Sequence, residues 1–233
     1  MLRRIPRKIK RVPRNILWQL FPTKTKEWDA LGSWKRKKAV EGRLKNSKFK
    51  EFYTKHFEIE DSFYSGKRIL DIGCGPRGSL EWADMALERI GLDPLAKQYL
   101  KLGADEHKTK YVAAYSESIP FDDDYFDVIS SFNSLDHVAD VQLTISEIKR
   151  VLKSGGEFLL LTELNHKPKI KEPQDFSWDI VHAFLPEFEI LNEKHYEMKV
   201  KGMYESIRYG IPFNHSDRSK RTGILSAKFR KFG

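Results

Sequence analysis

The sequence of 233 residues contains a single cysteine, Cys74. An intramolecular disulfide is therefore excluded, and the composition suits a reducing compartment. No apolar run approaches the roughly 20 residues that a membrane-spanning helix needs. The basic N-terminus lacks the apolar core and cleavage site of a secretory signal, and it lacks the serine typical of a transit peptide. These absences predict a cytoplasmic protein.

Acidic residues are missing from both ends of the chain. Residues 1–26 hold nine lysines and arginines, and residues 218–233 hold six. The rest of the chain has 27 basic and 33 acidic residues, so the net charge of +9 comes entirely from the two ends. We therefore predict a basic arm at 1–24 and a basic, exposed C-terminal tail at 215–233. A surface that binds polyanions would lie on these segments.

In the N-terminal arm, the basic residues stand beside an apolar patch that includes Trp18 and Phe21. This mixture is compatible with a solvated arm. It is also compatible with a peripheral contact between residues 1–21 and an anionic membrane surface. In the second case the protein would lie at the inner face of the membrane.

Residues 25–60 are predicted to form a helical extension. Trp28, Leu31 and Trp34 recur every three residues, which is typical of one face of a helix. A second short helix is predicted to carry Phe52 and Tyr53. The extension either packs on the rest of the domain or forms a lid over a substrate.

From residue 61 onward, short apolar runs alternate with helical patterns. The predicted strands are 68–72, 89–92, 111–114, 126–131, 157–162, 188–191 and 206–211, and the predicted helices are 79–87, 94–102, 140–152 and 175–184. This alternation predicts an α/β fold with a doubly wound, mostly parallel seven-stranded sheet over residues 61–214. Right-handed crossovers would align the carboxyl ends of the parallel strands at one edge, where ligands bind.

The first predicted strand ends in a glycine-rich turn. Gly73, Gly75 and Gly78 have the spacing of the dinucleotide-binding fingerprint, which by itself is a weak signal. Asp71 stands two residues before the first glycine. A carboxylate there would be poorly placed beside a pyrophosphate, but it can reach the cationic amino-acid end of a ligand. Cys74, between the glycines, is predicted to be a small loop residue.

The second predicted strand ends at Asp93, which is followed by Pro94. An acid at this position can accept hydrogen bonds from both hydroxyls of a ribose. It can also cap a helix that begins at the proline, and the two roles are compatible. Asp71 and Asp93 together therefore predict a site for a nucleoside with a cationic end.

Two further motifs follow in order: Ile119-Pro120-Phe121 before the fourth strand, and Gly155-Gly156 before the fifth. Taken with the glycine-rich turn and the second acid, residues 68–163 resemble the class I S-adenosylmethionine-dependent methyltransferases, specifically their methyltransferase type 11 group. The resemblance implies a Rossmann-like fold, S-adenosylmethionine as the cofactor, and methyl transfer as the reaction.

The resemblance also implies site residues. The cofactor loop would contain Asp71, Gly73, Cys74 and Gly75, and Asp93 with Pro94 would hold the ribose. The family commonly has an acidic residue after its third strand that contacts the adenine. Tyr115 occupies that place here, so Ser116 or Glu117 is expected to take over the role.

The acceptor is expected near the end of the fourth strand. His137 is the candidate general base, because imidazole titrates near pH ~6.5, and the adjacent Asp136 is a further candidate catalytic residue. Alternatively, His137 packs against the cofactor or caps the next helix. Asn133 could bind the acceptor or the amino-acid part of the cofactor.

Three polar residues after the fifth strand should face the same edge: Glu163, Asn165 and His166. They are candidates for the lining of the acceptor pocket. For His166 we expect a solvated ring, as is usual for a histidine in a loop. No Cys/His cluster with zinc spacing is present and no carboxylate set clearly requires magnesium, so no metal site is predicted.

The fourth strand does not end in the Asn/Asp-Pro-Pro-aromatic motif of many methyltransferases that act on the amino groups of bases. The sequence therefore favours O-methylation of a small-molecule, sugar or lipid-linked glycan acceptor. The alternative is an RNA methyltransferase whose basic arms bind phosphates. A nicotinamide-dependent oxidoreductase and a noncatalytic cofactor-binding scaffold are more distant alternatives.

Overall fold

The computed structural model describes residues 22–45, 49–169, 172–199 and 202–233. The basic arm and its predicted membrane contact through residues 1–21 lie outside this part of the chain. In the described ranges, no helix combines the length and the apolar character that crossing a membrane would require.

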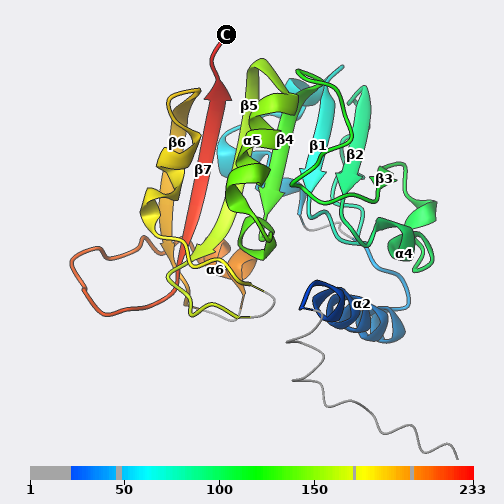
Figure 1. The fold of residues 1–233 in the computed structure, drawn as a ribbon, viewed down its shortest axis with the longest axis horizontal. Coiled ribbons are helices and arrows are strands. Elements are labelled where there is room, and N and C mark those ends of the chain that lie inside the picture. The colour runs from blue at the N-terminus through cyan, green and yellow to red at the C-terminus, as the bar shows by residue number, and fades with distance from the viewer. Residues whose placement is uncertain (1–21, 46–48, 170–171, 200–201) are drawn as a thin grey trace, which may run out of the picture.

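The described chain forms one seven-stranded sheet (Figure 1). Its strands are β1 (Arg68–Ile72), β2 (Glu88–Leu92), β3 (Lys110–Val112), β4 (Phe126–Phe132), β5 (Leu152–Leu164), β6 (Phe188–Glu197) and β7 (Gly223–Lys231). The order is β3-β2-β1-β4-β5-β7-β6. Strands β1 to β5 run parallel, and β7 runs antiparallel to both of its neighbours. The predicted α/β class with a mostly parallel, seven-stranded sheet is confirmed.

Helices and 3-10 turns cover the sheet on both faces. They are α2 (Pro22–Glu41), α3 (Lys50–Tyr53), η1 (Lys55–Phe57), η2 (Asp61–Tyr64), α4 (Ala96–Leu100), η3 (Ala104–Glu106), η4 (Leu135–His137), α5 (Val141–Val151), η5 (Trp178–Phe184) and α6 (Met203–Tyr209). Helices α5 and η5 pack on one face, around Phe158 and Phe229. The α3–η2 segment and α6 pack on the other face, around Phe52 and Tyr64. The sheet is therefore the middle of three layers.

The burial of both faces explains the apolar strands. All of β1 except Arg68 is buried, as is all of β4 except Asp127, which is usual for parallel strands covered on two sides.

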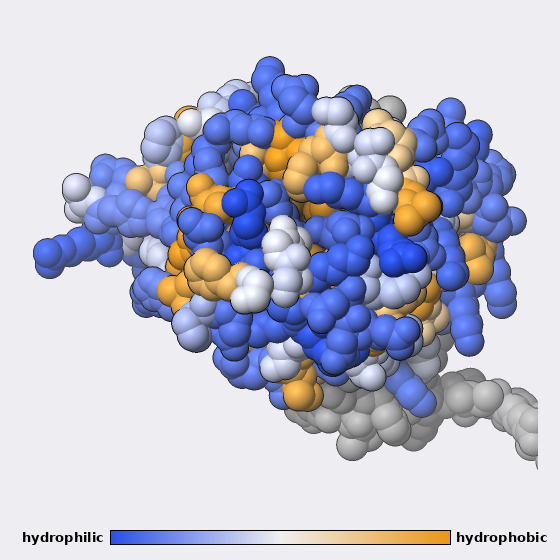
Figure 2. Space-filling view, turned by 90° about the horizontal axis from the view of Figure 1, so that it is seen from above, coloured by the Kyte–Doolittle hydropathy of each residue, from blue (hydrophilic) through white to orange (hydrophobic). Residues whose placement is uncertain are grey.

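The surface of the molecule seen in Figure 2 is mostly hydrophilic, and its hydrophobic side chains form small separate groups.

Helix α5 shows how the local sequence sets an element. The Asp140 side chain accepts a hydrogen bond from the Leu143 backbone N–H at 3.0 Å, which caps the first turn. Ile145, Ile148 and Val151 are buried at helical spacing. The predicted helix 140–152 is thereby confirmed.

The predicted helix 79–87 does not form; the chain makes consecutive turns instead. Two of its polar side chains bind elsewhere. Ser79 donates to the Asp71 carboxylate, and Glu81 accepts from the backbone N–H groups of Lys108 and Thr109 at 3.0 and 2.8 Å. These contacts hold the segment against the glycine-rich turn and the start of β3.

The last predicted strand, 206–211, was wrong, because most of it lies in helix α6. Met203, Ser206 and Ile207 are buried with the i, i+3, i+4 spacing of a helix. The seventh strand is β7 instead, inserted between β5 and β6. The prediction of an exposed basic tail at 215–233 is therefore also wrong for residues 223–231.

The basic residues of β7 bind other parts of the domain. Arg230 pairs with Glu157 at 3.1 Å. Lys231 pairs with Asp124 at 2.9 Å, and Lys228 donates to the backbone carbonyl of Phe57 at 3.1 Å. These cations stabilise the fold rather than forming a free basic arm.

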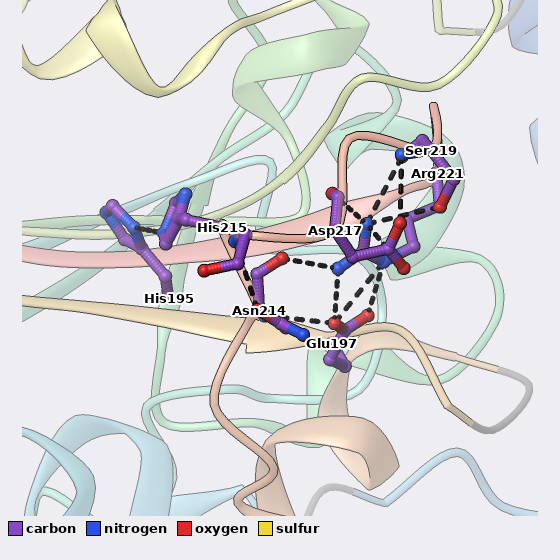
Figure 3. Close-up of polar contacts among 8 residues, drawn as sticks. His195, Glu197, Asn214, His215, Asp217, Ser219 and Arg221 are labelled. Carbon is purple, nitrogen blue, oxygen red and sulfur yellow. Dashed lines mark hydrogen bonds and ion pairs between the residues drawn. The ribbon is translucent and has the colours of Figure 1, made fainter.

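The loop before β7 is fixed by Arg221 (Figure 3). Its guanidinium binds both oxygens of the Glu197 carboxylate, with the shortest N–O distance 2.7 Å. It also donates to the backbone carbonyls of Asn214, Asp217 and Ser219. Glu197 is buried at the end of β6, so the Arg221 side chain joins the loop to the sheet.

We predict that Arg221→Ala lowers the free energy of unfolding by about 2 kcal/mol, because a buried carboxylate loses a charged hydrogen-bond partner. Urea denaturation followed by circular dichroism measures the change. The control is Lys97→Ala, at an exposed position in α4. Equal stability of the two variants would contradict this function of Arg221.

Candidate functional site

The carboxyl ends of β1, β2, β4 and β5 meet at the lower edge of the sheet in Figure 1. The chain leaves β1 for β2 on one side, whereas β4 pairs with the opposite side of β1. In open α/β sheets, ligands bind at such a reversal of strand order. Helix α2 lies below this edge, across the ends of the strands.

The glycine-rich turn follows β1 at this point. Gly73 and Gly75 have φ angles of 71° and 59°, a region that residues with a Cβ seldom adopt. A Cβ on Gly73 would lie 2.3 Å from the Cβ of Ser134, which follows β4. Ser134 Oγ in turn donates to the Ile72 carbonyl at 2.8 Å. The turn and the end of β4 therefore hold each other in place.

Asp71 lies buried at the end of β1 and accepts three hydroxyl hydrogen bonds. Ser130 donates to Oδ1 at 2.7 Å, and Tyr53 and Ser79 donate to Oδ2. Burial raises the pKa of Asp71 to about 6, although the hydroxyl donors act in the opposite direction. These contacts orient a carboxyl group that becomes protonated at a higher pH than usual, and a cationic ligand would favour its charged form.

Asp93 ends β2 in the same way. Its Oδ1 accepts from the Leu95 backbone N–H at 2.9 Å, and its Oδ2 lies 3.4 Å from the Tyr99 hydroxyl. Burial raises the pKa of this carboxyl to about 6. Pro94 follows and leads into α4. Helix α4 begins at Ala96 rather than at Pro94, so Asp93 is not its N-cap as the sequence suggested. The Asp93 carboxylate instead holds the turn before the helix, at the edge of the site.

The remaining predicted cofactor residues have structural contacts. The Cys74 sulfur faces Gly91 of β2, and burial raises the pKa of its thiol. Ser116 is buried and hydrogen-bonds Thr144 at 3.1 Å. Glu117 accepts from the backbone N–H groups of Ala139 and Asp140. The adenine role predicted for Ser116 or Glu117 remains a prediction.

Helix α2 supplies residues that the sequence did not assign to the cofactor site. The ring of Trp34 would lie 3.3 Å from a Cβ on Gly75, and Ala30, Leu31 and Trp34 pack around Leu95 and Tyr99. The Lys26 ammonium donates to the His137 backbone carbonyl, and burial lowers its pKa. The apolar periodicity predicted the helix but gave no sign of which partner it covers.

Three predicted acceptor residues lie together after β4. Asn133 has a φ of 54° and donates its backbone N–H to the Leu161 carbonyl of β5 at 2.8 Å. Asp136 is 1% exposed, whereas the His137 ring is partly exposed, with its Nε2 3.8 Å from Asp136 Oδ2. Burial raises the pKa of Asp136 to about 7. Asp136 and His137 therefore form a pair of ionisable side chains at the rim of the site.

His166, after β5, joins this pair from the other side. Its Nε2 lies 3.7 Å from the same oxygen of Asp136. The expectation of a solvated ring was wrong, because His166 is 5% exposed. The charges of Glu163 and Glu172 add to the burial effect on the pKa of Asp136. Glu172 lies in a segment that the sequence did not link to the site.

Residues 70–160 match the family model of a methyltransferase domain. This part of the chain is a methyltransferase domain similar to the class I S-adenosylmethionine-dependent methyltransferases. It is 31% identical over 124 residues to the uncharacterized methyltransferase YcgJ of Bacillus subtilis, covering 46% of this chain and 49% of that protein. The crystal structure of YcgJ has a TM-score of 0.54 and 18% identity, covering 72% of this chain and 93% of that one.

Other relatives are similar in the same region. The ubiquinone biosynthesis O-methyltransferase of Ruegeria sp. is 30% identical over 135 residues, 54% of this chain and 53% of that protein. A structure of geranyl diphosphate methyltransferase in complex with SAM has a TM-score of 0.52 and 16% identity, covering 71% of this chain and 78% of that one. The chain spans about half the length of the first curated relatives it matches.

The family implies S-adenosylmethionine as the methyltransferase cofactor, and the side chains at the turn fit it chemically. The cofactor offers an ammonium group and two ribose hydroxyls as donors. Asp71 and Asp93 offer buried carboxylate acceptors at the ends of adjacent strands. Positive φ angles at Gly73 and Gly75 open the backbone between them. The group that these residues would hold supplies an activated methyl on a sulfonium centre.

We predict that the affinity for S-adenosylhomocysteine falls as the pH is lowered from 7.5 to 5. The free carboxyl groups of Asp71 and Asp93 have pKa values of about 6, and the ligand favours their charged forms. At pH 5 each protonated group costs about tenfold in affinity. Calorimetry in two buffers of different ionisation enthalpy should also detect proton release near pH 6.

Asp93→Asn should weaken binding at pH 7.5 and make the pH dependence shallower, because one titrating group is gone. Asp105→Asn, at an exposed position, is the control. An affinity that stays constant between pH 7.5 and 5 would contradict the placement of these carboxylates at the ligand.

We predict that Trp34→Ala increases the dissociation rate of bound S-adenosylhomocysteine several-fold. The ring lies against Gly75 and joins α2 to the domain, so its loss should loosen the cover over the turn. Stopped-flow displacement measures the rate. Trp28→Ala is a matched control on the same helix, because Trp28 is 59% exposed. Equal rates in both variants would show that α2 is only a packing element.

Proposed function

We propose that this protein uses S-adenosylmethionine to O-methylate a small-molecule, sugar or lipid-linked glycan acceptor. The proposal depends on one observation: the Asp136 carboxylate stands between the rings of His137 and His166, at 3.8 and 3.7 Å. This group adjoins the glycine-rich turn through Ser134, which contacts Gly73 and Ile72. A hydroxyl at this rim would therefore meet both a base and the cofactor edge.

In this proposal His137 takes the proton of the acceptor hydroxyl. Its ring is partly exposed, so it is accessible to a substrate. The Asp136 carboxylate would stabilise the imidazolium that results. Lys26 and Asn133 hold the surrounding backbone through bonds to the carbonyls of His137 and Leu161. Alignment and exclusion of water by α2 would supply the rest of the rate enhancement.

The names of two relatives, a ubiquinone biosynthesis O-methyltransferase and a tocopherol O-methyltransferase, support a hydroxyl acceptor. Other relatives are named as C-methyltransferases that act on sterols or in ubiquinone and menaquinone biosynthesis. We further propose that the acceptor is reached at a membrane surface, through a peripheral contact of residues 1–21 with the inner membrane face. RNA as the acceptor has less support, because Lys228, Arg230 and Lys231 bind within the domain.

We predict that incubation with tritiated-methyl S-adenosylmethionine transfers label to the lipid or small-molecule fraction of a lysate. The lysate is divided into lipid, glycan, RNA and protein fractions, and the label in each is counted. With the labelled acceptor in hand, His137→Gln should lower kcat by about 100-fold or more, with little change in S-adenosylhomocysteine affinity.

His182→Gln is the matched control, because His182 is exposed on η5, away from the group around Asp136. Label that appears in RNA would favour the alternative acceptor. Tight S-adenosylhomocysteine binding without label in any fraction would indicate a cofactor-binding scaffold instead.

A further inference from the structure

We propose that Asp136, His166 and Glu172 bind a divalent transition-metal ion at the acceptor side of the site. One potential ligand atom from each residue lies within 4.8 Å of the other two. Metal–ligand bonds of about 2.0–2.2 Å place neighbouring ligand atoms about 3.0–3.6 Å apart. The three side chains would therefore have to move closer together by about 1 Å or more to converge on one ion.

The hydrogen bonding of His166 supports this assignment. Its Nδ1 lies 3.2 Å from the Lys167 backbone carbonyl, so Nδ1 carries a hydrogen, and in the neutral ring Nε2 then presents a lone pair. That lone pair faces a carboxylate oxygen of Asp136 at 3.7 Å. Two electron-rich atoms in this arrangement repel each other unless a proton or a metal ion lies between them. Backbone hydrogen bonding of the second nitrogen is also usual for metal-ligating histidines.

Two buried atoms of the cluster lack partners. Asp136 Oδ1 and His166 Nε2 have no hydrogen-bond partner within the described ranges, although both residues are almost fully buried. An unpaired buried polar atom costs about 1–3 kcal/mol. Such atoms call for an unseen partner, and a metal ion would satisfy both at once.

The loop that carries Glu172 is folded onto the site by the backbone. Asn165 donates to the Phe176 carbonyl at 2.9 Å and closes the base of the loop. Gln174 binds the carbonyls of Val138 and Ala139 at 3.1 and 3.2 Å, which brings the loop beside η4. Glu172 also pairs with the exposed Lys169 at 2.9 Å, and a metal ion would have to compete with this ammonium.

The ligand set indicates the class of metal. One imidazole and two carboxylates suit Zn²⁺ or Mn²⁺, whereas Mg²⁺ is usually bound by oxygen ligands alone. If the proposed function is correct, an ion here would hold the acceptor hydroxyl and lower its pKa. Only this role of the ion depends on the proposed function. The metal site itself can be tested separately, because metal binding can be measured without an acceptor.

The test is metal binding to the chelator-stripped protein, measured by calorimetry with Zn²⁺, Mn²⁺ and Mg²⁺ in separate titrations. We expect one equivalent of Zn²⁺ or Mn²⁺ to bind. Asp136→Asn, His166→Gln and Glu172→Gln should each weaken binding at least about tenfold. Glu172 is only half-buried, so its variant should fold even if the other two do not; thermal melting checks all three.

A second cluster serves as the control. His195 lies 2.8 Å from His215 and 2.6 Å from Glu193 (Figure 3 shows the two rings), and it could capture added Zn²⁺. His215→Gln should therefore leave the proposed site intact. Loss of binding in His215→Gln, with normal binding in Glu172→Gln, would overturn the proposal.

Absence of metal binding in the wild type would also overturn it. S-adenosylhomocysteine affinity, measured on the same samples, separates this failure from that of the proposed function. Normal affinity without metal binding would reject the metal site alone. Failure to bind S-adenosylhomocysteine would instead reject the methyltransferase proposal.

Discussion

The cofactor half of the candidate site depends on the hydrogen bonds that the buried Asp71 carboxylate accepts. Its oxygens collect hydroxyls from three parts of the chain: Tyr53 of the N-terminal extension, Ser79 after the glycine-rich turn, and Ser130 of β4. An ionised carboxyl without such donors would be costly in this position. The hydrogen bonds that stabilise the charge of Asp71 therefore also join the N-terminal extension, the glycine-rich turn and the sheet.

This constraint explains why the N-terminal extension belongs to the domain. Tyr53 Oη binds Asp71, and its ring packs 4.5 Å from that of Phe132 at the end of β4. Farther upstream, Trp34 lies against Gly75. Helices α2 and α3, which precede the sheet in sequence, therefore contact the glycine-rich turn and the end of the strand before it. Their apolar residues serve packing, and their polar atoms reach the site.

The sequence predicted the first five strands and the turn because their signals are local. A buried apolar run, a glycine pair and a terminal acid are all found within a few residues, as at Asp71 and Gly73. The last strand was missed because the signal was misleading: Lys228 and Arg230 alternate with buried residues in β7, and their charges suggested a solvated tail. Their partners, Phe57 and Glu157, are distant in sequence.

The site shows the same division between local and distant signals. Asp93 could be identified from its position after β2. His166 was expected at the same edge, but its approach to Asp136 and that of Glu172 could not be predicted, because these residues converge only through the fold. The burial of His166 depends on the loop that Asn165 and Phe176 close, and no local pattern in the sequence encodes that closure.

The proposed cofactor and acceptor sides of the sheet edge therefore differ in whether their buried polar atoms have hydrogen-bond partners. On the cofactor side, Asp71 and Asp93 accept from hydroxyls and backbone N–H groups before any ligand arrives. On the acceptor side, Asp136 and His166 each retain a buried atom without a partner in the described part of the chain. Preorganised acceptors suit a cofactor that always binds in one way. Unsatisfied buried atoms carry a cost that binding can relieve, and the proposed metal ion would relieve it at Asp136 and His166.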